Sequence, residues 1–200
     1  MSVASEDAPG PDPLAILAGW HAEARDSGAL EPDAMTLATV GPDARPSARL
    51  VLLKGIASSE ILFVSNYASR KGRDLEQNPH VALAFFWPEL LRQVRVEGRA
   101  RRAPASESDA YFATRPRESQ LGAWASPQSE PIATRDVLEA RFAEASARFA
   151  TGEIERPPRW GIYRVLPERV ELWIARPHRL HDRFLYIREG SGWSVVRLSP

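Results

Sequence analysis

The 200-residue chain contains no cysteine, which excludes a disulfide framework, thiolate metal ligands and cysteine nucleophiles. Its formal net charge is zero, so no overall field draws it to nucleic acid or to an acidic membrane. No apolar run reaches membrane-spanning length, and the N-terminus lacks the basic and apolar regions of a secretion signal. We therefore expect a cytoplasmic protein that binds neither membrane nor nucleic acid. Any anion site must come from a local cluster of charge.

Lysine is nearly absent from a chain rich in arginine. Only two of the 26 basic residues are lysines, and both of them, Lys54 and Lys71, lie within residues 45–71. In the same stretch, Ser69, Arg70 and Lys71 open a polar run with the spacing of a helix. A helix start of this kind brings backbone N–H groups, a hydroxyl and two cations to one point, which favours a phosphate site. A solvated, capped helix end explains the same residues.

Many short apolar or alternating segments predict a mainly β protein with peripheral helices, arranged as an antiparallel barrel. The expected strands span residues 35–40, 50–53, 61–64, 80–86, 91–103, 160–166, 169–175, 184–189 and 193–198. Helices are expected to begin at Asp12-Pro13, Ser69, Ser106 and Thr134. The apolar run 80–86 suits a strand buried on both faces. Residues 1–11 are expected to form a disordered tail, and residues 12–200 a single domain.

Two alternative binding functions receive little support. The strand expected at residues 91–103 carries arginines on both faces, but no aromatic residues for base stacking alternate with them. A solvated sheet face explains that pattern better than an RNA surface does. His178 and His181 are three residues apart but lack a third ligand, so we expect no metal site.

A second dense cluster, Arg179-Leu-His-Asp-Arg183, lies between two expected strands. His181 beside Asp182 is a candidate oriented acid or base, and the two arginines are candidates for holding an anionic substrate or cofactor. The alternative is a turn held by its own ion pairs, which contribute little when exposed.

A third candidate group shares a regular spacing. Tyr111, Arg115 and Ser119 recur every four residues, so they would lie on one face of a continuous helix. Pro116 favours a turn at that point, yet all three side chains can still converge on a phosphate.

Taken together, these motifs resemble those of the pyridoxamine 5′-phosphate oxidase family. The matching pieces occur in order from about Asp12 to the C-terminus: Arg49-Leu-Val-Leu-Leu-Lys54, Ser69-Arg-Lys71, Arg92-Gln-Val94, Arg115-Pro-Arg-Glu-Ser-Gln120, Gly122-Ala-Trp124, Gln128-Ser129 and Arg179-Leu-His-Asp-Arg183. The resemblance implies an FMN-binding split β-barrel and a homodimer with FMN bound across the subunit interface. It also implies oxidation of pyridoxamine or pyridoxine 5′-phosphate to pyridoxal 5′-phosphate, with hydride transfer from C4′ to flavin N5 and O₂ reduced to hydrogen peroxide.

The resemblance also implies a role for individual residues. The positions that would contact FMN are Arg49, Lys54, Ser65, Arg70, Lys71, Gln93, Gln128, Ser129, Trp173 and Arg183. The positions that would hold the substrate phosphate are Lys54, Tyr111, Arg115 and Ser119. Arg179 and His181 would lie beside the substrate ring as the catalytic pair.

The chain departs from the family pattern in three places. Val64 replaces a frequent aromatic residue, Ile174-Ala175 replaces the usual Gln-Gly, and the N-terminal segment lacks an Arg-x-x-Tyr motif. Two alternatives therefore stay open: an FMN-dependent oxidase of another substrate such as a phenazine precursor, and a flavin- or vitamer-binding protein with little turnover.

Overall fold

The computed structural model describes residues 8–57 and 59–200. Most of the expected disordered tail, residues 1–7, lies outside this range. Residues 8–11, which that prediction also included, lie against the sheet. The hydroxyl of Tyr186 donates a hydrogen bond to the Gly10 carbonyl at 2.9 Å, and Ala8 packs on the hydrophobic core.

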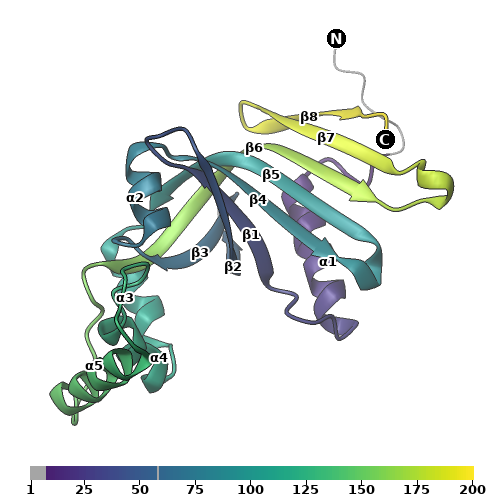
Figure 1. Cartoon of the computed structure of the whole chain (residues 1–200). Coiled ribbons are helices and arrows are strands. Elements are labelled where there is room, and N and C mark those ends of the chain that lie inside the picture. The colour runs from purple at the N-terminus through teal and green to yellow at the C-terminus, as the bar shows by residue number, and fades with distance from the viewer. Residues whose placement is uncertain (1–7, 58) are drawn as a thin grey trace.

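The described chain forms one antiparallel sheet that closes into a barrel (Figure 1). Its strands are β1 (Ala34–Val40), β2 (Pro46–Ala57), β3 (Glu60–Asn66), β4 (His80–Trp87), β5 (Arg92–Arg102), β6 (Trp160–Ile174), β7 (Asp182–Glu189) and β8 (Gly192–Arg197). Neighbouring strands pair in the order β3-β2-β1-β4-β5-β6-β7-β8. An additional pairing of β3 with β6 closes the six strands β1–β6 into the barrel. The antiparallel barrel expected from the sequence is therefore confirmed.

The prediction of two separate strands at 160–166 and 169–175 is wrong, because β6 runs unbroken through both segments. The first part of β6 pairs with β3, and the second part pairs with β7. Pro167, which pairs with Gly98 of β5, is accommodated by a register shift between β5 and β6 that leaves Glu168 as an extra residue in β6. A side chain at Gly98 would place its Cβ 2.2 Å from the Leu166 carbonyl, so glycine permits this close approach.

The prediction that β4 is buried on both faces is also wrong. Val81, Leu83, Phe85 and Trp87 point into the core, whereas the Phe86 side chain is 58% exposed. A single barrel has one interior, and the other face of β4 points away from it in this chain.

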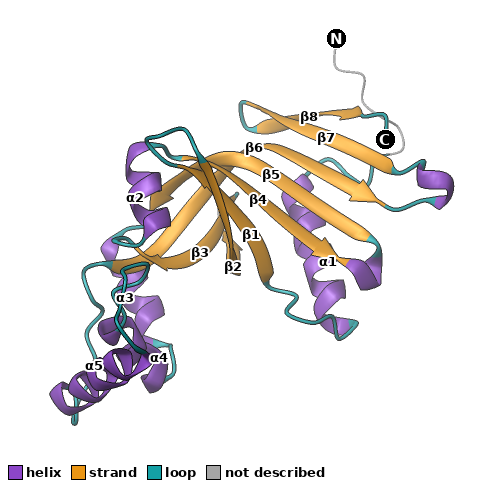
Figure 2. Cartoon of the chain, in the orientation of Figure 1, coloured by secondary structure: helices purple, strands orange, loops and turns teal. Residues whose placement is uncertain are grey.

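The described residues form five α-helices, which lie at the margins of the barrel (Figures 1 and 2). They are α1 (Pro13–Asp26), α2 (Arg70–Gln77), α3 (Ala105–Ala113), α4 (Arg117–Ala125) and α5 (Arg135–Arg148), with short 3₁₀ turns η1 (Pro88–Leu90) and η2 (Pro177–Arg179). The expected cap of α1 is confirmed, since the Asp12 carboxylate accepts a hydrogen bond from the Leu14 N–H at 2.9 Å. The expected cap of α3 is wrong: the helix begins after Pro104, and no side chain caps it. Among the described residues, no helix is long and apolar enough to cross a membrane.

Helices α3, α4 and α5 form a lobe at one end of the barrel, which Figure 1 shows at the lower left. A second hydrophobic core joins this lobe to the start of β6, and its buried residues are Phe112, Leu121, Ala145, Ile154 and Trp160. The apolar residues of α5 are only partly buried: Ala145 is enclosed, but the Phe142 side chain is 36% exposed. The main core is formed by the inward side chains of the barrel strands and extends to α1.

Candidate active site

A cleft of about 580 Å³ opens beside β2, the end of β3 and the start of α2. It collects seven of the ten residues expected to contact FMN: Arg49, Lys54, Ser65, Arg70, Lys71, Gln128 and Ser129. Four of these side chains are cationic, and none of the described lining residues is a carboxylate. The cleft is therefore suited to an anionic ligand.

Arg49 is held in the cleft from behind. Its guanidinium donates to the Thr39 hydroxyl at 2.7 Å and to the Leu37 carbonyl at 3.2 Å. Thr39 in turn donates to the buried carboxylate of Asp74 at 2.7 Å. This carboxylate lies 4.0 Å from the guanidinium of Arg49. Burial lowers the pKa of Arg49, the Asp74 carboxylate opposes this shift, and the charge of Arg70 adds to it. The guanidinium is thus fixed in place, with its charge only partly compensated.

The start of α2 is capped as the sequence predicts, but the Ser69 hydroxyl does not face the cleft. This hydroxyl is fully buried, accepts from the Gly72 N–H at 3.3 Å and donates to the Asn66 carbonyl at 2.7 Å. A Cβ at Gly72 would lie 2.1 Å from the Tyr67 carbonyl, so only glycine fits there. The capping role expected for Ser69 is confirmed, whereas its direct role in a phosphate site is not supported.

Lys71 is the most perturbed cation of the cleft. Its ammonium donates to the Gln128 side-chain oxygen at 2.9 Å and to the Ser69 hydroxyl at 3.3 Å, with 8% of the residue exposed. Burial and, to a smaller extent, the nearby charge of Arg49 together lower the pKa of Lys71 to about 8. A buried ammonium with neutral partners and a neighbouring cation is stabilised by an anion.

A second pocket, of about 420 Å³, adjoins the first at Lys54. Tyr111 of α3 lines this pocket together with His21 and Asp33, whose side chains lie 2.8 Å apart. Two of the four residues expected to hold the substrate phosphate, Lys54 and Tyr111, therefore share one pocket.

Arg115, the third of these residues, is stacked on an aromatic surface. Its guanidinium lies 4.5 Å from the ring centroid of Trp160 and 5.5 Å from that of Phe112. Burial lowers its pKa, and its buried Nη1 has no hydrogen-bond partner among the described residues. The fourth residue, Ser119, lies half-buried on α4. An unpaired buried guanidinium nitrogen is the kind of donor that an anion satisfies.

The turn between α3 and α4 is fixed by a buried amide that we did not single out from the sequence. The Gln120 side chain donates to the carbonyls of Phe112, Ala113 and Arg115 at 3.0, 3.3 and 3.1 Å. These carbonyls lie at the end of α3 and in the turn that follows it, so the amide ties the turn to the helix end. The four-residue spacing of Tyr111, Arg115 and Ser119 thus crosses two helices rather than following one.

The other predicted site residues lie on a separate part of the sheet. Gln93 of β5 is opposite Trp173 of β6, which is opposite Arg183 of β7. The ring of His181 lies 4.5 Å from that of Trp173, and Arg179 ends η2 nearby. These five residues form a second group, distinct from the cleft.

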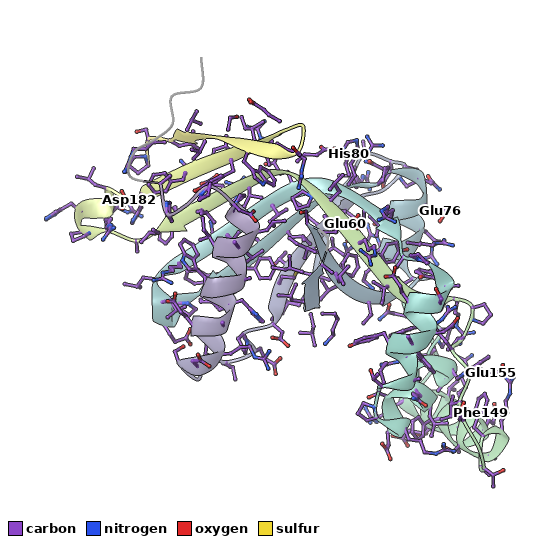
Figure 3. All side chains as sticks on the ribbon, turned by 180° about the vertical axis from the view of Figure 1, so that it is seen from behind. Glu60, Glu76, His80, Phe149, Glu155 and Asp182 are labelled. Carbon is purple, nitrogen blue, oxygen red and sulfur yellow. The ribbon has the colours of Figure 1, made fainter. Side chains whose placement is uncertain are left out.

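The second group shares no residue with the lining of either pocket. Asp182, beside the second group, lies at the opposite end of the molecule from Phe149 and Glu155 of the helical lobe (Figure 3). One chain therefore does not bring all the predicted site residues together.

The expected pairing of His181 with Asp182 is wrong. The Asp182 carboxylate instead accepts from Arg176 and Arg197, each at 2.6 Å, and these bonds lower its pKa. His181 accepts a hydrogen bond at Nδ1 from the Arg176 backbone N–H at 3.1 Å, so its neutral ring carries the proton on Nε2. The ion pairs of Asp182 therefore reach residues outside the Arg179–Arg183 cluster, and the Nε2 edge of His181 has no hydrogen bond within the described part of the chain.

The closed antiparallel barrel with its helical lobe defines a split-barrel protein. Residues 22–149 match the family described as pyridoxamine 5′-phosphate oxidase, and residues 160–200 match the pyridoxine 5′-phosphate oxidase C-terminal dimerisation region. A pyridoxine/pyridoxamine 5′-phosphate oxidase of Rubrobacter xylanophilus is 58% identical, over 98% of this chain and 90% of the relative. One from Sphingopyxis alaskensis is 53% identical, over 94% and 88%. The chain therefore belongs to the pyridoxamine 5′-phosphate oxidase family and is an oxidoreductase.

Two solved structures resemble the fold. PhzG from Burkholderia lata, in complex with tetrahydrophenazine-1-carboxylic acid, has a TM-score of 0.91 at 33% identity and covers 97% of this chain and 95% of its own. A pyridoxamine 5′-phosphate oxidase-related, FMN-binding protein from Nostoc punctiforme has a TM-score of 0.74 at 19% identity, with 96% and 100% covered. The second likeness concerns the fold alone.

Proposed function

We propose that this enzyme binds FMN and oxidises pyridoxamine 5′-phosphate, pyridoxine 5′-phosphate or both to pyridoxal 5′-phosphate. The observation that carries the proposal is the pair of adjoining pockets that meet at Lys54, the larger of which is lined by four cationic side chains. A phosphorylated cofactor beside a phosphorylated substrate requires two such pockets in contact. The names of the close relatives support this choice of substrate.

The donor set of the larger cleft fits the phosphate of FMN. Arg70 and Lys71 lie at the start of α2, where a phosphate would receive charge-assisted hydrogen bonds. Arg49 is held by Thr39 and Asp74 with part of its charge uncompensated, and a phosphate would complete that compensation. Ser65, Gln128 and Ser129 add neutral hydrogen-bonding groups, which suit the uncharged parts of the cofactor.

The protein contributes position and charge to the reaction. The chemistry that FMN supplies when bound is acceptance of a hydride from substrate C4′ at flavin N5 and return of the electrons to O₂ as hydrogen peroxide. In this proposal Lys54, Tyr111, Arg115 and Ser119 hold the substrate phosphate. Arg179 orients the substrate ring as a permanent cation, because a guanidinium does not release its proton at neutral pH. His181 presents its Nε2–H to the substrate as a hydrogen-bond donor.

A homodimer explains why the site residues form two groups at separate parts of one chain. The cleft of one subunit and the Arg179–Arg183 cluster of its partner would then make one complete site. Exposed apolar side chains beside the cleft and on β4 support this assembly, among them Leu50 at 69% and Phe86 at 58% exposure. The match of residues 160–200 to a dimerisation region supports it as well.

An anaerobic titration tests the proposed reaction. Protein reconstituted with FMN and mixed with pyridoxamine or pyridoxine 5′-phosphate without oxygen should lose its flavin absorbance as hydride is transferred. Admission of air should restore the band and produce peroxide. A flavin that stays oxidised with both vitamers would contradict the assigned substrate, and failure to bind FMN would contradict the cofactor.

A phenazine precursor is the second candidate substrate, favoured by the likeness to PhzG in complex with tetrahydrophenazine-1-carboxylic acid. Lys54, Tyr111 and Arg115, which we assign to the substrate phosphate, favour a phosphorylated B6 vitamer. A carboxylated phenazine precursor has no phosphate for them to bind. Parallel titration with both compounds separates the two candidates: the true substrate reduces the flavin in the first turnover.

A binding protein with little turnover is the third candidate, motivated by Ile174-Ala175. In the structure the Ile174 side chain packs against the main core, and the Ala175 N–H donates to the Leu91 carbonyl at 2.9 Å. This place therefore continues the sheet instead of offering an amide side chain to a ligand. Sustained oxygen consumption at substrate-limited rates would exclude this candidate.

A further inference from the structure

We propose that Trp160 is a positioning residue that sets the orientation of Tyr111 and Arg115 for a phosphate ester. The inference rests on the proposed function, because it assigns these two side chains to the substrate phosphate. Trp160 itself does not touch the substrate in this assignment; it acts through the two residues packed on its ring.

The geometry around the indole carries the inference. The Tyr111 ring stacks on the Trp160 ring with centroids 6.2 Å apart and planes 9° from parallel. The Arg115 guanidinium lies 4.5 Å from the Trp160 centroid. One buried ring thus contacts both side chains. Tyr111 lies in the last turn of α3, and Arg115 lies in the turn that follows this helix. A change in the ring would alter both side chains at once.

The Trp160 indole can orient other side chains only if it is itself held in place by the fold. Trp160 is 6% exposed and begins β6 in register with Asn66 of β3. Its carbonyl accepts from the Arg156 guanidinium at 2.6 Å, and the same guanidinium donates to Asp109 of α3 at 2.7 Å. Arg156 therefore ties the Trp160 backbone and α3 together.

The same stacking leaves Arg115 able to bind an anion. A guanidinium on an aromatic ring has its face covered, while its N–H edges stay available for bidentate contact with a phosphate. In this structure the buried Nη1 of Arg115 has no hydrogen-bond partner among the described residues. Stacking on Trp160 thus fixes the plane of the Arg115 guanidinium without using its N–H donors.

A purely structural role for Trp160 predicts a different outcome. Trp160 belongs to the core of the helical lobe, so its loss would also lower stability. A core residue would affect phosphorylated and unphosphorylated ligands alike. A positioning residue for the phosphate grip affects only the phosphorylated ligand.

The test compares Trp160→Leu and Trp160→Phe with the unchanged protein, all loaded with FMN. Calorimetry measures the dissociation constants of 4-deoxypyridoxine 5′-phosphate and 4-deoxypyridoxine, which lack the oxidisable C4′ group. We expect Trp160→Leu to raise the dissociation constant of the phosphorylated ligand by about 2- to 30-fold, the range of a cation–π contact. The dissociation constant of the unphosphorylated ligand should stay unchanged. Trp160→Phe keeps an aromatic surface and should lose less.

Trp193→Leu is the matched control, because Arg188 lies 4.4 Å above the Trp193 ring on the C-terminal hairpin, away from these residues. It should leave the ratio of the two dissociation constants unchanged. If the parent prefers the phosphorylated ligand and both Trp160 variants keep the same ratio of dissociation constants, the role assigned to Trp160 is overturned, while the proposed function stands. If Trp160→Leu does not fold, Trp160→Phe decides by the same ratio. A parent protein that does not prefer the phosphorylated ligand would contradict the proposed substrate, and this inference with it.

Discussion

Replacing Lys71 with methionine should weaken the cofactor and, at the same time, stabilise the cofactor-free protein. Methionine keeps most of the length of the side chain and removes the charge. The two effects have opposite signs because the ammonium is buried among neutral partners and near Arg49. Such a cation is unfavourable until an anion joins it.

The size of the stability effect follows from the pKa. A fall from 10.5 to about 8 corresponds to about 3 kcal/mol of cost for the charged form at pH 7. The cleft is open to solvent on one side, and screening reduces this figure to about 2 kcal/mol. For a chain of this length, that corresponds to a rise in melting temperature of about 4–8 °C. The size of the binding effect follows from the loss of one charge-assisted hydrogen bond, about 1.5–3 kcal/mol or about 10- to 150-fold in Kd.

Two measurements on the same preparation check both signs. Thermal unfolding of FMN-stripped protein at pH 7 reports the stability, and quenching of flavin fluorescence during titration reports the Kd for FMN. Arg45→Met serves as a control, since Arg45 lies in the exposed turn between β1 and β2 and outside the cleft. It should change neither quantity appreciably. A Lys71→Met protein that melts at or below the parent temperature, or that binds FMN as tightly as the parent, would refute the argument.

Three further predictions follow from the site and from the sheet. Arg179→Ala should lose turnover while keeping its flavin, and unchanged kinetics would remove Arg179 from the mechanism. Co-expression of Arg179→Ala with Lys71→Met chains should restore activity in mixed dimers, because one of the two composite sites is then intact; no recovery in isolated mixed dimers would contradict sites shared between subunits. Gly161→Ala should lower the melting temperature, because its Cβ would lie 2.0 Å from the Tyr67 hydroxyl. Gly122→Ala is its control, with nothing within 4 Å and a helical position where alanine is preferred. Equal melting temperatures for the two glycine variants would show that the space around Gly161 relaxes.

The sequence was sufficient where one local signal acts alone. Period-two alternation identifies β5, and the Asp12-Pro13 and Ser69 signals identify the starts of α1 and α2. Local signals failed where two distant elements decide the outcome. Pro167 is a strand breaker in its own segment, yet a register shift between β5 and β6 beside it lets β6 continue. The burial of β4 depends on what covers the outside of the barrel, and its own apolar run does not carry that information.

The candidate site divides in the same way. The cations at Arg70 and Lys71 are visible in the sequence by their residue type and spacing, and Arg49 is indicated by the family resemblance. The residues that hold these cations in place are not visible in the sequence. Asp74 contacts Arg49 through Thr39, and Thr39 and Asp74 are 35 positions apart in the chain. Trp160 is also hidden, because its contacts with α3 arise from the closure of the fold and leave no periodic pattern.

The pKa of Lys71 also gives a reason for lysine in a chain that otherwise relies on arginine. In the cofactor-free fold this pKa is about 8, against 10.5 for the ordinary side chain. Between these two values the unfolded chain binds more protons than the folded one, so the free energy of unfolding rises with pH across that window. A bound phosphate raises the pKa again, so binding above pH 8 takes up a proton, and affinity for FMN should fall as pH increases past 8, by at most tenfold per pH unit. Lys71→Arg stays charged and should remove this decline, which a series of FMN titrations from pH 7 to about 10 would measure. A decline of the same size in Lys71→Arg would assign the pH dependence to another group.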